Sequence, residues 1–422
     1  MITPAGSARA AVAGAIDQTS PTVTLQDIVQ RDGVFVDGDW VESKDQDPNG
    51  DVRLIQLADI GDGTYRDKSS RYLTAVKAVQ LRCTFLEAGD VLVARMPDPL
   101  GRACIFPGDK RRAVTVVDVA VVRPHNPAVN VRWLMYRINA SDFRRSVASL
   151  QAGSTRQRIS RKNLATIEFS VPARSVQDSV VAEIEKQFSR LDEAVANLQR
   201  VKANLRRYKA SVLDSAFKGN EAWQWSTYSE IGVVTTGFTP PTGDAANFGG
   251  AIPFIKPTDL DTGERVVTAR EHLTEQGLTK GRKLPAGSIL VTCIGATIGK
   301  TGLAAVDCAT NQQINGVSPR RGLVESKFVY WWTVSPAGQR QIIENASATT
   351  LPILNKSKFS ALAVPLPPLA EQHRIIAEVD RRLSIVREVD AEVDANLKRA
   401  QALRQAVLAR AFRANEDSPV HA

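Results

Sequence analysis

The chain has few of the residues that hold metals or form disulfides. Its 422 residues include four cysteines and four histidines. The cysteines, Cys83, Cys104, Cys293 and Cys308, form no CxxC pair, and no group of histidines lies near them. The sequence therefore argues against a zinc site or a disulfide framework, and it favours free thiols in the cytosol.

Long hydrophobic runs are also missing. No stretch reaches the roughly 18 apolar residues that a membrane span needs, so we expect no membrane partner. Residues 1–20 are small and alanine-rich, and they lack the long apolar core of a signal peptide. We interpret them as a loose leader of a cytoplasmic protein.

Motifs that perform chemistry are absent as well. We find no glycine-rich loop for S-adenosylmethionine, no Asn/Asp-Pro-Pro-aromatic motif and no carboxylate cluster with a lysine for metal-assisted hydrolysis. GATIGKT, at 295–301, has three residues between its glycines where a phosphate-binding loop needs four. We therefore expect a non-catalytic chain without a catalytic, metal or cofactor site of its own.

Positive charge is concentrated in one segment. The formal net charge is +9, and residues 95–162 carry fourteen Lys and Arg against four Asp. This segment is either an ordinary solvated basic surface or a face that follows nucleic-acid phosphates.

A duplication runs through the chain. A shift of 195 residues aligns Val171–Glu221 with Leu366–Glu416 without a gap. The identical pairs include Pro172/Pro367, Gln177/Gln372, Glu183/Glu378, Leu213/Leu408 and Phe217/Phe412.

Both copies have the apolar periodicity of a long helix. Apolar residues recur at steps of three and four over roughly 40 residues, or about 60 Å of helix. We expect the two helices to pack antiparallel within the chain, although each stripe could instead pair with another protein. The predicted seam is Ile184, Phe188, Leu191, Val195, Leu198, Leu205, Val379, Leu383, Val386, Val393, Leu397 and Val407.

The regions before the helices match more weakly. Val52–Gly63 parallels Ile252–Gly263, and Leu86–Ala103 parallels Leu284–Thr301. Short β-rich runs bounded by Gly, Pro and Asp indicate strands and turns. The fold class that follows is α+β: two mixed α/β domains separated by two long antiparallel, coiled-coil-like helices, with an internal pseudo-two-fold duplication. The expected segments are a leader (1–20), domain 1 (21–171), helix 1 (172–220), domain 2 (221–365), helix 2 (366–416) and a tail (417–422).

LPPLAEQHRIIAEVDRRL, at 366–383, resembles the entry to the conserved helix of type I restriction-modification specificity subunits. The second α/β domain, which precedes this helix in the sequence, resembles that family's target-recognition domain. It carries GFTPPTG (237–243), IPFIKPTDL (252–260), AGSILVTCIGATIGKTG (286–302), NQQING (311–316) and TTLPILNKSKFSALAVPLPP (349–368). The first half lacks the GxTP, ATIGK and NQQ signatures, so its membership depends on its helix and on the duplication.

The resemblance implies a function. Each domain would read one half of a bipartite double-stranded DNA target, and the helices would fix the spacer and dock two methyltransferase (M) subunits. A restriction and motor (R) subunit would complete the complex. The M subunits would bind S-adenosylmethionine and methylate adenine, while this chain would perform no chemistry.

DNA contact requires Lys or Arg for phosphates, and amide, hydroxyl or Arg groups for base edges. Each candidate could equally be structural. The candidates in the second half are Thr239, Lys256, Thr297, Lys300, Asn311, Gln312, Gln313, Thr350, Asn355 and Lys356. Those in the first half are Gln56, Arg95, Arg102, Arg111, Arg112, Arg156, Arg158 and Arg161.

Two other functions stay open. The chain could be a scaffold whose helices and α/β domains bind only proteins, and the basic segment at 95–162 argues against this. An ATPase or nuclease ranks third, because the motifs that such chemistry requires are missing.

Overall fold

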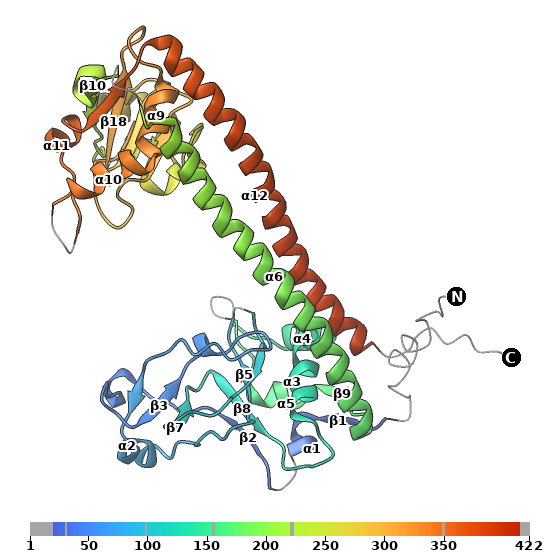
Figure 1. Ribbon diagram of the computed structural model, residues 1–422. Coiled ribbons are helices and arrows are strands. Elements are labelled where there is room, and N and C mark those ends of the chain that lie inside the picture. Colours follow the sequence, from blue (N-terminus) through green and yellow to red (C-terminus); the bar gives the residue numbers. More distant parts are fainter. Residues whose placement is uncertain are drawn as a thin grey trace, which may run out of the picture. The chain divides into compact units, whose positions relative to one another are not determined.

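The computed structural model describes residues 20–29, 32–97, 99–153, 157–219, 223–347 and 351–413. The chain divides into two compact units (Figure 1). Unit 2 is the continuous stretch Leu198–Ala395, whereas unit 1 joins the residues up to Asn197 to those from Asn396 onward. The predicted leader (apart from Ser20), Arg156, Thr350 and the tail at 417–422 lie outside the described residues.

Unit 1 contains the first α/β module, called module 1 below, which precedes α6 in the sequence. Its strands are β1 (Thr22–Thr24), β2 (Val34–Asp37), β3 (Val52–Ile55), β4 (Tyr72–Leu73), β5 (Val91–Ala94), β6 (Ala103–Ile105), β7 (Arg112–Thr115), β8 (Val119–Arg123) and β9 (Glu168–Ser170). Its helices are α1 (Leu25–Val29), α2 (Ala75–Gln80), α3 (Val131–Asn139), α4 (Ser141–Ser149) and α5 (Arg161–Ala165), with 3-10 turns η1 (Ser43–Asp45) and η2 (Leu57–Asp59).

Unit 2 contains module 2, which lies between the two long helices in the sequence. Its strands are β10 (Gln224–Thr227), β11 (Gly232–Thr236), β12 (Phe248–Ile255), β13 (Glu271–Leu273), β14 (Lys283–Leu284), β15 (Ile289–Thr292), β16 (Thr301–Leu303), β17 (Cys308–Thr310), β18 (Ile314–Pro319) and β19 (Ala363–Leu366). Its helices are α7 (Tyr228–Ile231), α8 (Glu275–Lys280), α9 (Ser326–Val334), α10 (Pro336–Glu344) and α11 (Lys356–Ser360), with 3-10 turns η3 (Ala245–Asn247) and η4 (Pro257–Thr262).

The two modules share one topology. The antiparallel sheet β2-β8-β5-β6 of module 1 corresponds to β11-β18-β15-β16 of module 2. A second sheet, β4-β3-β7, corresponds to β13-β12-β17-β14, and in both the third strand pairs parallel to the second. Strand β14 has no counterpart among the described residues of module 1. The duplication predicted from the helices thus extends through the modules.

Buried strands at the centre of each module explain this shared architecture. All four residues of β5 (VLVA) and of β15 (ILVT) are buried, as expected for short apolar runs covered on both faces. On one side the helices α3 and α9 supply large aromatic side chains, including the fully buried Trp133 and Trp331. Each module is therefore a sheet core covered by helices.

The two long helices, α6 (Arg174–Ala216) and α12 (Leu369–Ala411), pair within each unit. In unit 1 the beginning of α6 packs against the end of α12, where Ile184 and Phe188 share a core with Leu408 and Phe412. The guanidinium group of Arg404 lies 4.0 Å above the ring of Phe188. An early stretch of one helix thus meets a late stretch of the other, so the pairing is antiparallel.

Unit 2 repeats this arrangement with the helices exchanged. Val212 and Leu213, near the end of α6, share a core with Val379 and Leu383, near the beginning of α12. Closer to the middle, Lys202 pairs with Asp394. The predicted fold class is confirmed: two α/β modules are combined with two long helices that pair antiparallel.

Candidate nucleic-acid interface

Three turns of module 2 meet where β11 and β12 end and β17 leads into β18. The backbone N–H of Phe238 donates to the carbonyl of Thr310 at 2.9 Å, and that of Asn311 donates to Ile255 at 3.2 Å. A Cβ on Gly237 would lie 2.2 Å from the carbonyl oxygen of Asn311, so only glycine permits this approach. The three turns therefore form one continuous surface.

Four predicted DNA-contacting residues lie on this surface: Thr239, Lys256, Gln312 and Gln313. A fifth, Asn311, is buried, with 7% exposure. The hydroxyl of Thr239 donates to Oε1 of Gln312 at 2.6 Å. The amide of Asn311 donates to Oε1 of Gln313 at 2.9 Å, and its own Oδ1 accepts from the Gln313 backbone at 3.2 Å. Hydroxyl and amide groups are thus held in fixed positions, as base-edge recognition requires.

Two of the three lysines among the module 2 candidates have carboxylate partners. Lys256 pairs with Glu271 and lies 5.6 Å from the ring centroid of Phe254, while Lys300 pairs with Asp261 at 2.7 Å. Both lysines and Glu271 are partly exposed, and Asp261 is 79% exposed. A phosphate could therefore compete for either lysine, because exposed ion pairs contribute little to stability.

The turn between β15 and β16 joins the same surface. The backbone N–H of Cys293 donates to the carbonyl of Gln313 at 2.7 Å, and that of Leu354 donates to Cys293 at 2.8 Å. Thr297, another candidate, is exposed on this turn. Segments near residues 293, 313 and 354, far apart in sequence, are thereby brought together.

Asn355 has a local role. Its Oδ1 accepts from the backbone N–H of Lys358 at 2.9 Å and caps α11. Lys356 is exposed on the first turn of that helix. Lys356 thus remains more accessible to a ligand than Asn355, whose side-chain oxygen is already used.

Module 1 has an equivalent surface that the sequence did not reveal. A Cβ on Gly38 would lie 2.1 Å from the carbonyl oxygen of Val116, and the backbone N–H of Asp39 donates to Thr115 at 2.7 Å. Gly38 therefore occupies the position of Gly237. The sequence parallel between 52–63 and 252–263 pairs Gln56 with Lys256, and Thr115–Asp118 stand where NQQ stands in the second half. GDWV, however, replaces GFTP around Gly38.

The equivalent positions carry different side chains in module 1. Trp40 occupies the position of Thr239, Gln56 that of Lys256, and Asp118 that of Gln313. Together they border a hollow of about 360 Å³. It is lined by Asp39, Trp40, Val41, Glu42, Gln56, Leu57, Ala58, Val116, Val117 and Asp118.

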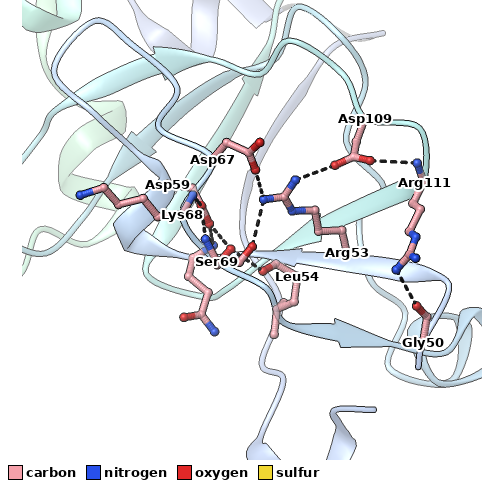
Figure 2. A network of polar contacts seen from close by, with 10 residues as sticks. Gly50, Arg53, Leu54, Asp59, Asp67, Lys68, Ser69, Asp109 and Arg111 are labelled. Atoms are coloured by element: carbon pink, nitrogen blue, oxygen red, sulfur yellow. Dashed lines mark hydrogen bonds and ion pairs between the residues drawn. The ribbon is translucent and has the colours of Figure 1, made fainter. Parts of the chain in front are cut away.

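A buried carboxylate holds the turn that carries Gln56 (Figure 2). Asp59 accepts from the backbone N–H groups of Gln56 at 2.8 Å, Lys68 at 2.6 Å and Ser69 at 2.7 Å, and from the Ser69 hydroxyl. Burial acts to raise the pKa of Asp59, but these hydrogen bonds outweigh it and the pKa is lowered. The turn is therefore held by an ionised carboxylate.

Next to this carboxylate, Figure 2 shows a second ionic group. Arg53 pairs with Asp67, and with Asp109 at 2.8 Å. The backbone N–H of Arg111 donates to Asp109 at 3.0 Å, and its guanidinium group donates to the carbonyl of Gly50 at 3.3 Å. Arg111, a predicted DNA contact, thus projects from an ordered network.

Two other predicted contacts are buried inside module 1. The side chains of Arg95 and Arg102 belong to residues that are only 3% and 5% exposed. Arg95 donates to the carbonyls of Val117 and Ile159, and Arg102 donates to that of Ile60 at 2.7 Å. These two arginines therefore stabilise turns of the module from within, and no surface for DNA reaches them.

Half of the basic residues in the segment at 95–162 are paired with carboxylates. Seven of its arginines pair with carboxylates: Arg95, Arg123, Arg132, Arg137, Arg144, Arg158 and Arg161. Most of the partners lie outside the segment: Asp37, Asp62, Glu87, Asp90 and Glu185. The excess of Lys and Arg over Asp in this segment therefore overstates the positive charge that a phosphate would meet.

The remaining candidates of module 1 lie at its surface. Arg111 and Arg112 are exposed, and Arg112 lies 3.4 Å above the ring of Phe85. Arg158 lies 3.4 Å from Asp118, and Arg161 donates to the carbonyl of Phe35 at 3.0 Å. These arginines stay predictions as DNA contacts.

The predicted seam residues lie on the paired stretches of α6 and α12. Those buried are Ile184, Phe188, Val379, Leu383, Val386 and Val393. Those partly buried are Leu191, Val195, Leu198, Leu205, Leu397 and Val407. Apart from Val393, the buried seam residues lie near the modules.

One buried glutamine in each unit connects the module to the beginning of a long helix. Gln177 donates to the carbonyls of Ala128 and Pro172 at 2.9 and 2.8 Å and accepts from the Asn130 backbone at 2.8 Å. Gln372 makes the same three kinds of contact in unit 2, with its acceptor bond from Glu325. The sequence identity of the two glutamines was visible, but this role was not.

Comparison with known proteins agrees with the duplicated architecture. Residues 220–390 match the family described as type I restriction modification DNA specificity domain. These residues are similar to a type I DNA specificity domain. This domain spans module 2, including the surface around Asn311, and the first half of α12, and it confirms the predicted resemblance to type I specificity subunits.

Curated relatives of this domain are also specificity subunits. The EcoBI subunit of Escherichia coli is 28% identical over 166 residues, which are 38% of this chain and 35% of the relative. The EcoDI subunit of Escherichia coli is 20% identical over 296 residues, which are 62% and 65% of the two chains. The chain thus spans between about a third and two thirds of these relatives.

A solved structure extends the likeness to the fold of the whole chain. It comes from work on complex assembly and conformational transition of the type I R-M system. The match has a TM-score of 0.69 at 17% identity and covers 94% of this chain and 98% of the other. The specificity domain therefore belongs to a chain whose overall fold is already known.

Two further observations concern only the described residues. They contain no group of three or more His, Cys, Asp or Glu side chains that could hold a metal ion. No helix in that part of the chain is long and apolar enough to span a bilayer.

Proposed function

We propose that this chain is the DNA-reading subunit of a cytoplasmic type I restriction-modification complex. Each module reads one half of a bipartite double-stranded target, and the long helices set the spacing between the halves. Two methyltransferase subunits and a restriction subunit complete the complex.

The repetition of one surface in two modules carries this proposal. Gly38 and Gly237 allow the same close turn, and each turn is followed by an exposed or partly exposed side chain, Trp40 or Thr239. Two similar surfaces with different side chains are what a bipartite, asymmetric DNA target requires, because recognition differs by base while the scaffold is repeated.

We place the chemistry outside this chain. In this proposal the methyltransferase subunits bind S-adenosylmethionine and transfer the methyl group to adenine. The chain supplies position and selectivity, and it needs no catalytic residue or cofactor.

The paired helices in unit 2 present a surface for a protein partner. Val201 and Tyr208 on α6, and Ile385 and Val389 on α12, are exposed apolar side chains. Apolar groups on a helix surface indicate an interaction site when they gather. We assign this surface to a methyltransferase subunit.

Co-purification tests this assignment. The variant Ile385→Asp should lose most of the methyltransferase that co-purifies with the chain, because a carboxylate would be buried without a partner. The neighbouring exposed Ser384→Asp is the matched control and should retain it. Equal recovery with both variants would contradict the assignment.

Spacer length tests the proposed function as a whole. A seven-residue insertion in each long helix, at positions that face each other, keeps the apolar stripe in phase and adds about 10 Å. The methylated target, read by methylation-aware sequencing, should then have a spacer longer by about three base pairs. An unchanged spacer would refute the spacing role of the helices.

A protein-binding scaffold remains the second candidate. The pairing of seven arginines in the basic segment weakens the charge argument against it. The two functions differ in salt dependence: DNA binding should weaken steeply between about 50 and 200 mM salt, because counterions are released. Binding of duplex DNA that is weak at every salt concentration would favour the scaffold.

A further inference from the structure

The hollow of module 1 combines an exposed aromatic ring with a hydrogen-bond acceptor. Trp40 is 68% exposed, although tryptophan is usually well buried. Its ring N–H donates to Glu42 at 3.3 Å, which leaves the face of the ring open. Asp118, which also lines the hollow, is partly exposed. An apolar plane and a carboxylate are therefore available to one ligand.

The surroundings make the carboxylate compatible with DNA. An acidic group near phosphates is repelled unless cations lie close to it. Arg158 lies 3.4 Å from Asp118, and the backbone carbonyl of the adjacent Val117 accepts from Arg95. Arg158 therefore offsets the charge of Asp118, whereas Arg95 already pairs with Asp37 at 3.2 Å.

The chemistry of the carboxylate defines the atom that it would select. An ionised carboxylate only accepts hydrogen bonds. In the major groove, the base donors are the exocyclic amino groups of cytosine N4 and adenine N6. At the equivalent position, module 2 has Gln313, whose amide both donates and accepts.

We propose that the hollow of module 1 is its base-reading site. Asp118 accepts a hydrogen bond from an exocyclic amino group of cytosine or adenine, and the ring of Trp40 packs against the apolar edge of the neighbouring base. This inference rests on the proposed function and names its first specificity-determining residues.

Duplexes that lack one amino group test the inference. The full chain, with its co-purifying methyltransferase, is first selected against a random duplex library to define the target. Single cytosines are then replaced by 2-pyrimidinone and single adenines by purine, so that only the amino group is lost. For the wild-type chain, one such position in one half-site should raise Kd about tenfold.

Variants assign this effect to the hollow. Asp118→Ala should bind the complete and the amino-deleted duplex with Kd values within about twofold of each other. Trp40→Ala, which removes an exposed side chain, should weaken binding of the same half-site without altering thermal stability. The matched control is Glu87→Gln, an exposed carboxylate outside the hollow, which should keep the tenfold effect.

The outcomes separate this inference from the proposed function. If the wild-type chain selects no bipartite target, the proposed function fails. If it selects one but Asp118→Ala remains as sensitive as wild type to every amino deletion, only the role of the hollow is overturned. A Trp40→Ala variant with unchanged selection and affinity would overturn it equally.

Discussion

The loss of one side chain, Gln177 or Gln372, should lower the stability of the module that it contacts. Each is fully buried, donates to two carbonyls and accepts from one backbone N–H. Replacement by alanine leaves these backbone groups without partners in a site that water does not reach. We expect Gln177→Ala and Gln372→Ala each to lower the free energy of unfolding by about 2–3 kcal/mol.

Chemical denaturation of the two variants measures this loss. Gln187→Ala is a suitable control, because Gln187 is a partly exposed glutamine on the same helix that bonds only to Glu183. A cost for Gln177→Ala no larger than that of the control would show that the buried contacts are unimportant.

Asp39, at the edge of the hollow, should make stability depend on pH. Burial raises its pKa from 3.8 to about 6, against the lowering effect of its hydrogen bond from the Thr84 backbone. The folded state therefore binds a proton more tightly than the unfolded state. The resulting destabilisation is complete above pH 6 and disappears as the pH falls from 6 towards 4.

Asp39→Asn should remove this pH dependence. The neutral amide can still accept from Thr84, so the variant should be more stable at pH 7 by about 1 kcal/mol after allowance for solvent screening. At pH 4 the two proteins should unfold at the same temperature. Thermal unfolding at several pH values checks this, and parallel curves for the two proteins would contradict the assignment.

Single residues were the hardest feature to predict from the sequence. Arg95 and Arg102 look like phosphate ligands, but their burial depends on turns that lie far away in the sequence. Trp40 belongs to no motif, and the contact between Gly38 and Val116 places it on the surface equivalent to that of module 2. Asp118 stands in the sequence where NQQ stands in the second half, but its residue type did not mark it as a DNA contact. Chemical type predicts what a side chain can do, whereas its surroundings decide whether it does so.

At the scale of elements, the long helices were predicted well from the sequence. A stripe of apolar residues and a gap-free repeat predicted their length and antiparallel pairing, because helix periodicity is local and repetition is visible without a structure. The modules were predicted less well, since short strands depend on partners that are remote in sequence.

Apolar contacts should contribute more to the helix pair than its ion pairs. Phe188 packs against Tyr136 with ring centroids 5.7 Å apart, and Phe188→Ala should cost about 3–5 kcal/mol. Leu383→Ala, at the repeat-equivalent position in unit 2, should cost about 2–5 kcal/mol. Lys202→Ala removes partly exposed ion pairs with Asp390 and Asp394, and should cost at most about 1 kcal/mol.

Urea denaturation of these three variants measures which substitution lowers the free energy of unfolding most. A Lys202→Ala variant that is destabilised as much as Phe188→Ala would show that charge, and not the apolar stripe, holds the helices together.

At the scale of the whole molecule, the two units differ in whether they include residues from the carboxyl-terminal end of the chain. Unit 1 needs residues from beyond 395, because Leu408 and Phe412 complete its core and the ring of Phe412 lies 5.9 Å from that of Trp133. Unit 2 ends at Ala395. A chain truncated after residue 395 should therefore lose protection in its first module while the second stays folded.

Hydrogen exchange followed by mass spectrometry measures this difference. In the truncated chain, peptides from α3 should exchange at least tenfold faster than in the full chain, whereas peptides from α9 should not change. The point substitution Phe412→Ala, with the chain at full length, should produce a weaker version of the same pattern. Equal protection of α3 with and without residues 396–413 would contradict it.

The discontinuity of unit 1 has a consequence for synthesis on the ribosome. Domains usually fold in the order in which they emerge, the amino-terminal one first. Here the second half of the chain is complete as soon as Ala395 has left the exit tunnel, while the first half still waits for Leu408 and Phe412. Module 1 precedes unit 2 in the sequence but thus completes its native packing after it, and until then part of its apolar core stays exposed to water.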